Sequence, residues 1–106
     1  MDLAQRLSHL ESNRDWQAFV EELEKGLAAE SVATEKAQLH LSLGRVLFQK
    51  FLSGVKALKH FQDAFKQDAR LVEALAEARD VYWLLGKLNM VQKLLELELK
   101  SAGDGP

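Results

Sequence analysis

The chain has 106 residues, of which 47% are apolar and 28% charged, the length and balance of a single soluble globular domain. It has no cysteine, which excludes disulfide bonds and thiolate metal sites, and its net charge of −2 argues against a dedicated nucleic-acid-binding protein. No apolar run approaches the roughly 20 residues that span a bilayer, and the first residues lack the apolar core of a signal peptide, so we expect a cytoplasmic protein without membrane insertion.

Apolar residues at helical spacing predict three helices in the first half of the chain. We expect them over residues 2–11, 15–29 and 35–51. Ser31 and Thr34 carry hydroxyl oxygens that can cap the third helix at its N-terminus. The side chains expected to face inward are Leu3, Leu7, Leu10, Trp16, Phe19, Val20, Leu23, Leu27, Leu39, Leu43, Val46, Leu47 and Phe51.

The second half of the chain predicts three more helices, over residues 55–67, 71–85 and 90–100. Gly86 is expected to end the fifth helix, and Asn89 to cap the sixth. The only proline is the last residue of the chain, so no proline interrupts any of these helices.

The predicted breaks between helices are short, which requires each helix to fold back on the one before it. We therefore expect one all-α domain over residues 1–100, built from three antiparallel pairs. The pairs fall at about residues 1–30, 35–68 and 71–100, and residues 101–106 form a flexible tail or a linker.

A sequence repeat relates these pairs. The fourth helix contains the spacing Ala57-x3-Phe61-x2-Ala64. The sixth helix has a counterpart 34 residues later, Val91-x3-Leu95-x2-Glu98. The second helix contains Phe19-x3-Leu23-x2-Gly26, while the third and fifth helices contain Leu43-Gly44-x2-Leu47 and Ala78-Arg79-x2-Tyr82.

These spacings resemble the tetratricopeptide repeat, whose first helix reads Trp-x2-Leu-Gly-x2-Tyr and whose second reads Ala-x3-Phe-x2-Ala. The resemblance implies a right-handed solenoid of helical hairpins. The spacing has a physical cause, because two helices approach closely only where side chains are small. Gly44, Ala57 and Ala64 leave that room, and Phe61 is expected to fill the gap beside them.

The chain departs from the family pattern at several positions. His40 stands where the pattern has tryptophan, and Ala69 where it has proline. Arg79 replaces a small residue, and Glu98 replaces an alanine. Residues 1–30 match the pattern only in their second helix, so the resemblance covers two good repeats and one degenerate repeat.

In tetratricopeptide proteins the first helices of successive repeats line a concave groove that holds a segment of a partner protein. The resemblance therefore implies a protein-binding adaptor or scaffold. The residues that we expect to bind the partner are Gln38, Arg45, Phe48, Gln49, Glu77, Asp80 and Trp83. Leu41 and Ser42 also lie on this exposed side, where some family members place polar residues that clamp a terminal carboxylate, so that mode of binding is not expected.

Ordinary structural roles compete with binding at three of these positions. Phe48 and Trp83 can equally well pack between neighbouring helices. Arg45 can form a surface salt bridge with Glu77 or Asp80, an interaction worth little energetically. Arginine and tryptophan are, however, frequent anchors of protein interfaces.

The last predicted helix is apolar over more than one face. Terminal repeats normally present a polar outer surface, so a second apolar stripe suggests that something docks on it. Val91, Leu95 and Leu99 are the residues expected to mediate this contact, with a second copy of the chain or with an adjacent domain. Assembly or dimerisation through this helix is therefore the alternative function.

No motif indicates catalysis or a cofactor. His9, His40 and His60 are scattered, and no pair of histidines has the spacing of metal ligands on one helix. We expect no enzymatic activity, no metal and no cofactor. Residues 45–70 carry a net charge of +4 between acidic flanks, which favours attraction of an acidic partner. Trp16 is expected to pack against the first and third helices.

Overall fold

The computed structural model describes residues 2–102, and within this range the chain forms six helices and no strand. The helices are α1 (Leu3–Ser12), α2 (Trp16–Ala29), α3 (Ala33–Gln49), α4 (Gly54–Gln67), α5 (Val72–Leu84) and α6 (Leu88–Ala102). The predicted all-α class and the six helices are confirmed, with boundaries that differ from the expected ones by at most two residues. Most of the predicted tail, residues 103–106, lies outside the described range.

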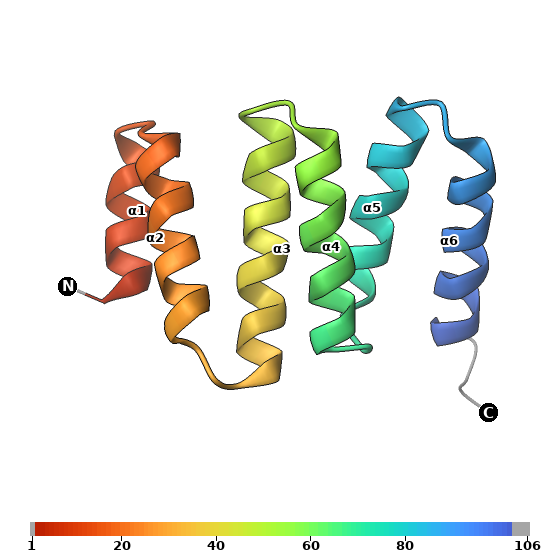
Figure 1. Ribbon diagram of the computed structural model, residues 1–106, viewed down its shortest axis with the longest axis horizontal. Helices are drawn as coiled ribbons and strands as arrows, with labels where there is room; N and C mark the ends of the chain where they lie inside the picture. Colours follow the sequence, from red (N-terminus) through yellow and green to blue (C-terminus); the bar gives the residue numbers. More distant parts are fainter. Residues whose placement is uncertain (1, 103–106) are drawn as a thin grey trace.

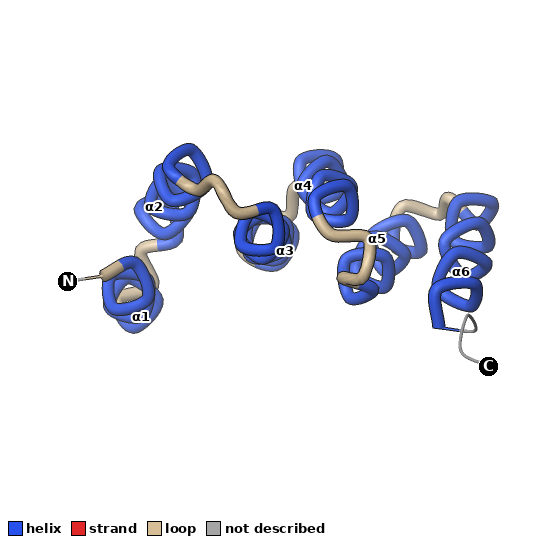
Figure 2. Tube along the Cα trace, turned by 90° about the horizontal axis from the view of Figure 1, so that it is seen from below, coloured by secondary structure: helices blue, strands red, loops and turns tan. Residues whose placement is uncertain are grey.

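The helices follow one another side by side along the longest dimension of a molecule that measures 43 × 31 × 20 Å (Figure 1). Each helix packs on its neighbours in the chain, and α3 also contacts α5. Figure 2 shows that α1, α3 and α5 form one row, with α2 and α4 on the other side of it and α6 beside α5 at the end of the molecule. The chain thus builds two layers of helices, and α3 and α5 lie on the same side with α4 behind them.

The α3–α4 pair is packed through the small residues that the sequence pattern singled out. Gly44, Ala57 and Ala64 are all buried, and so is Phe61. A Cβ atom on Gly44 would lie only 2.6 Å from Cδ1 and 2.8 Å from Cζ of the Phe61 ring. The ring therefore occupies the space that the missing side chain leaves, which confirms the predicted role of these residues.

The core divides into two clusters of buried side chains. The larger one spans α3, α4 and α5 and contains Ala37, Leu41, Ala57, Leu58, Phe61, Ala64, Leu71, Ala74, Ala78 and Val81. The smaller one joins α2 to α3 through Leu23, Leu43 and Val46. The expected exposure of Leu41 is therefore wrong, since this side chain is only 3% exposed. The reason is that α3 is covered by α2, α4 and α5, so more than one of its faces is buried.

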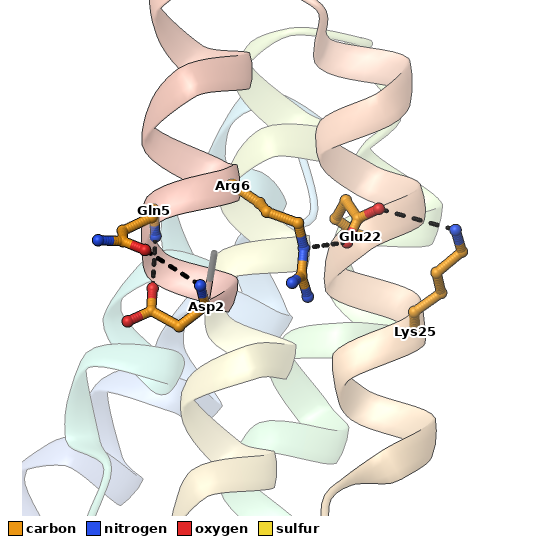
Figure 3. Close-up of polar contacts among 5 residues, drawn as sticks. All are labelled: Asp2, Gln5, Arg6, Glu22 and Lys25. Atoms are coloured by element: carbon orange, nitrogen blue, oxygen red, sulfur yellow. Dashed lines mark hydrogen bonds and ion pairs between the residues drawn. The ribbon is translucent and has the colours of Figure 1, made fainter.

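Hydrogen bonds and ion pairs stabilise the start of α1 and its contact with α2 (Figure 3). The Asp2 carboxylate accepts a hydrogen bond from the Gln5 backbone N–H at 2.8 Å, and the Gln5 side chain accepts one from the Asp2 N–H at 3.1 Å. This reciprocal capping box satisfies two backbone donors at the start of α1. Arg6 Nε then contacts Glu22 Oε2 at 2.9 Å, while Lys25 Nζ lies 3.7 Å from Glu22 Oε1, so a charged group from α1 is held against α2.

Two predicted helix caps are wrong. The residue that caps α3 is Val32, without a side-chain hydrogen bond, rather than Ser31 or Thr34. Helix α6 begins at Leu88, so Asn89 lies inside its first turn. Lys87 is the last residue before the helix, and its carbonyl already accepts from the Met90 N–H at 3.0 Å and from the Val91 N–H at 3.1 Å.

Gly86 does end α5, as predicted. Its backbone has a φ of +74°, the left-handed conformation that glycine adopts without a Cβ penalty. Its N–H donates to the Trp83 carbonyl at 3.1 Å, and the Lys87 N–H donates to the Tyr82 carbonyl at 2.9 Å. This pair of bonds is the Schellman motif, which satisfies two of the free carbonyls at a helix C-terminus.

The α5–α6 pair contains an ion pair at the two positions that depart from the repeat pattern. Arg79 Nη1 lies 2.7 Å from Glu98 Oε2, and the two side chains are 29% and 16% exposed. A large cation on one helix is thus matched by a carboxylate on the next. Across residues 2–102, no helix is both long enough and apolar enough to cross a membrane.

Candidate functional site

Five of the seven predicted binding residues line one cavity between α3 and α5. It has a volume of about 110 Å³, and its lining is formed by Arg45, Phe48, Gln49, Phe61, Glu77 and Asp80. Phe61, which is buried on α4, contributes the sixth lining side chain. The structure therefore brings together side chains from positions 45–49 and 77–80, which are far apart in the sequence.

An ion pair crosses this cavity. Arg45 Nε donates to Glu77 Oε1 at 2.6 Å, so the salt bridge considered for Arg45 is present. The other carboxylate oxygen of Glu77, Oε2, is buried and accepts no hydrogen bond from the described residues. Asp80 adds a second, exposed carboxylate. One cation faces two anions here, and the exposed Asp80 carboxylate is the acceptor that a donor group of a ligand can reach.

The two predicted aromatic residues occupy different environments. Phe48 is partly buried and packs against the larger core cluster. Trp83 is 63% exposed and lies one helical turn beyond Asp80 on α5. Neither Trp83 nor Gln38, which is exposed two turns before Arg45 on α3, lines the cavity. These two residues therefore flank the site rather than form it.

A larger hollow, of about 410 Å³, lies on the other side of α3. It is lined by Glu11, Arg14, Trp16, Phe19, Ser42, Arg45, Val46, Gln49 and Lys50. Arg45 and Gln49 line both spaces, so the two hollows are neighbours along the α1–α3–α5 row (Figure 2). The sequence analysis assigned Trp16 only a packing role and missed this hollow, because no local pattern indicates which side chains of α1, α2 and α3 meet.

The aromatic floor of the larger hollow is ordered by contacts within it. The Trp16 and Phe19 rings meet edge to face with their centroids 5.4 Å apart. Lys50 Nζ lies 4.7 Å from the Trp16 ring centroid, a cation–π distance. The charges that line this hollow are Arg14, Arg45 and Lys50 against Glu11. The larger hollow is therefore basic, whereas the smaller cavity is acidic.

His40 and His60 form a contact that the sequence analysis missed. Their Nδ1 atoms lie 3.0 Å apart, in the interface between α3 and α4. The signal was present but indirect: each residue lies within three helical turns of the α3–α4 turn, and antiparallel helices bring such positions together.

Both imidazoles are harder to protonate than a free histidine. Burial lowers the pKa of His40, the Asp63 carboxylate raises it in part, and Lys36 lowers it further. Burial likewise lowers the pKa of His60, and the neighbouring His40 acts in the same direction. When both rings are neutral, the Nδ1–H of one can donate a hydrogen bond to the unprotonated Nδ1 of the other. Two protonated rings would instead point two donors at each other.

The residues proposed for self-association differ in exposure. Leu99 is 72% and Leu95 41% exposed on α6, whereas Val91 is only 8% exposed and offers almost no surface to a partner. An apolar cavity of about 230 Å³ opens between α4, α5 and α6, with Phe65, Leu94 and Leu97 among its lining residues. Of the three residues proposed for self-association, only Leu95 and Leu99 therefore present apolar surface.

The chain matches no protein-family model and no curated protein. Among the described residues, no group of three or more histidine, aspartate and glutamate side chains is placed to hold a metal ion. The geometry of the two hollows is therefore the main guide to function.

Proposed function

We propose that this protein is a tetratricopeptide-like repeat domain that binds a segment of another protein along its α1–α3–α5 face, and that it acts as a cytoplasmic adaptor without catalysis. The observation that carries the proposal is the cavity between α3 and α5. Five side chains selected from the repeat pattern line it together. The antiparallel pairs and the nesting of Phe61 against Gly44 support the repeat architecture.

The charges of the face indicate which groups a bound segment presents. Near Asp80, the segment offers a hydrogen-bond donor or a cation, because the exposed carboxylate of the cavity lies there. A partner that spans both hollows crosses α3 over Arg45 and Gln49. Such a segment is held by side chains from all three helices of the row.

Affinity capture followed by mass spectrometry tests the proposal. Proteins retained by the wild-type chain should be lost with Asp80→Lys and with Arg45→Glu, because each change reverses a charge that lines the cavity. Glu24→Lys is the matched control, since Glu24 is an exposed acid on α2, outside the α1–α3–α5 row, and does not line the cavity. Retention of the same proteins by all variants, with unchanged circular dichroism, would contradict the proposal.

The exposed leucines of α6 favour a second candidate function, which is assembly of the domain with a copy of itself. Leu95 and Leu99 present apolar surface without a covering element among the described residues. Light scattering coupled to size exclusion tests this function. A dimer that becomes a monomer with Leu99→Glu supports it, whereas a monomeric wild-type protein at high concentration excludes it.

A further inference from the structure

The larger hollow between α1, α2 and α3 has the features of a site for negatively charged side chains. We propose that it binds a glutamate or aspartate, with an adjoining apolar residue, from an acidic segment of the partner protein. This inference rests on the proposed function and names the chemistry of the partner at one end of the α1–α3–α5 face. Four observations carry it.

The first observation is the balance of charge. Arg14, Arg45 and Lys50 line the hollow, and Glu11 is the one acid among its lining residues. Arg45 is engaged by Glu77 through Nε. Among the described residues, Arg14 and Lys50 take part in no ion pair. Two cations without a carboxylate partner thus converge on one concavity, which raises the local potential for anions.

The second observation is the apolar floor. Trp16 and Phe19 provide aromatic surface, and Val46 beside them is buried. Lys50 lies over the Trp16 ring, which holds its ammonium group at the hollow rather than in free solution. A volume of about 410 Å³ has room for more than one side chain. A cationic rim above an aromatic floor therefore fits a carboxylate together with a neighbouring apolar group.

The third observation is the backbone of Arg14. The α1–α2 turn has the same hydrogen bonds as the α5–α6 turn, with the Arg14 N–H donating to Glu11 and the Asp15 N–H donating to Leu10. Arg14 occupies the left-handed position, with a φ of 55°, that Gly86 fills in the other turn. Folding alone favours glycine at this position. An arginine there points to a use for its side chain, which lines the hollow.

The fourth observation concerns the surroundings and favours a protein over a nucleic acid. Residues 36–62 contain no aspartate or glutamate, so the α3 side of the hollow is free of competing acids. Residues 1–44, by contrast, carry a net charge of −4; Glu11 lines the hollow itself, and Asp15 lies between Arg14 and Trp16 in the chain. A long polyanion would extend from the hollow over this acidic surface and be repelled. A short acidic segment can fit within the hollow without extending over this surface.

Binding of synthetic peptides tests the inference. The probe is a short fluorescein-labelled peptide with Glu and Phe at alternating positions, compared with a Lys–Phe peptide of equal length. We expect fluorescence anisotropy to show binding of the acidic peptide alone, weakened by added salt. Lys50→Glu should weaken binding by up to about fivefold, the worth of one exposed ion pair. Lys93→Glu makes the same charge change at an exposed site on α6 and should have no effect.

Arg14→Gly separates binding from folding. Glycine suits the left-handed backbone at this turn, so the variant should unfold at a higher temperature than the wild type while it binds the acidic peptide more weakly. A merely structural arginine would not produce these opposite effects. Weaker binding accompanied by a lower unfolding temperature would overturn this part of the argument.

Other outcomes overturn the inference directly. They are an absence of acidic-peptide binding, equal losses with Lys50→Glu and Lys93→Glu, and tighter binding of single-stranded oligothymidine than of the acidic peptide. The last result would assign the hollow to nucleic acid. If captured proteins are lost with Asp80→Lys but kept with Lys50→Glu, the proposed adaptor function stands and the acidic-segment inference fails.

Discussion

In the α3–α4 pair the helices meet over small residues, with Phe61 filling the space above Gly44. In the α5–α6 pair, two positions that the repeat pattern reserves for small residues hold Arg79 and Glu98, which contact each other at 2.7 Å. The same antiparallel architecture is thus maintained once by close apolar packing and once with a partly buried ion pair. The comparison teaches that an antiparallel pair of helices tolerates either small apolar residues or two large side chains of opposite charge at these positions.

The largest expected effect is a disruption of the close packing in the α3–α4 pair. Ala57→Glu places a charge in a position that is 0% exposed, and we expect the free energy of unfolding to fall by more than about 4 kcal/mol. Urea denaturation followed by circular dichroism measures this loss. Lys56→Glu, at the exposed neighbouring position, is the control and should change little. A folded Ala57→Glu protein of near wild-type stability would contradict this account of the pair.

A smaller loss is expected when the α5–α6 ion pair is broken. Arg79→Leu leaves the Glu98 carboxylate, which is 16% exposed, without its partner, and should cost about 1–3 kcal/mol. The double variant Arg79→Leu, Glu98→Leu removes both charges and should recover most of this loss. Denaturation of the single and double variants checks the coupling. Additive losses in the double variant would show that the two side chains do not act as a pair.

The turns of the two pairs place different residues in the left-handed backbone conformation. Leu52, in the α3–α4 turn, has a left-handed φ of 53° and is 83% exposed, whereas the α5–α6 turn places Gly86 in this conformation. Leu52→Gly should raise the free energy of unfolding by about 1 kcal/mol, because it relieves backbone strain and loses little packing.

Gly86→Ala is the reciprocal test of the turns. It should lower the free energy of unfolding by about the same 1 kcal/mol, through backbone strain, since a Cβ at this position meets no atom within 4 Å. Thermal melts of both variants measure the changes. Destabilisation by Leu52→Gly would show that the leucine side chain has a stabilising contact.

The smallest effect is a pH dependence confined to the α3–α4 interface. Folding lowers the pKa values of His40 and His60 below their ordinary value of 6.5. As pH falls through 6.5, the unfolded chain takes up protons that the folded chain does not, so stability decreases below this pH and is retained above it. Melting temperatures recorded from about pH 8 to about pH 5 should show the decrease.

The control for this pH effect is the double variant His40→Gln, His60→Gln. Without the two imidazoles the chain should lose most of the slope just below pH 6.5, while the slope from carboxylates at lower pH should remain. An unchanged slope in the double variant would assign the pH dependence to other groups.

Local sequence determined the helices of this protein and the small residues of its central pair. Helical spacing of apolar residues is a property of each segment, and the left-handed turn at Gly86 follows from the lack of a side chain. The repeat pattern also placed Arg45, Gln49 and Asp80 on the exposed sides of α3 and α5, and the structure joins them at one cavity. Binding of a partner at that cavity stays a prediction.

Only the tertiary structure decided which side chains from different helices meet. Leu41 is buried because α3 is covered on several sides, and His40 reaches His60 because α3 and α4 are antiparallel and in this register. The hollow around Trp16 likewise depends on how α1 and α3 flank α2. The physical reason is that helical periodicity is set by the backbone over a few residues, whereas contacts between helices depend on their crossing points and offsets, which the packing of the whole domain determines.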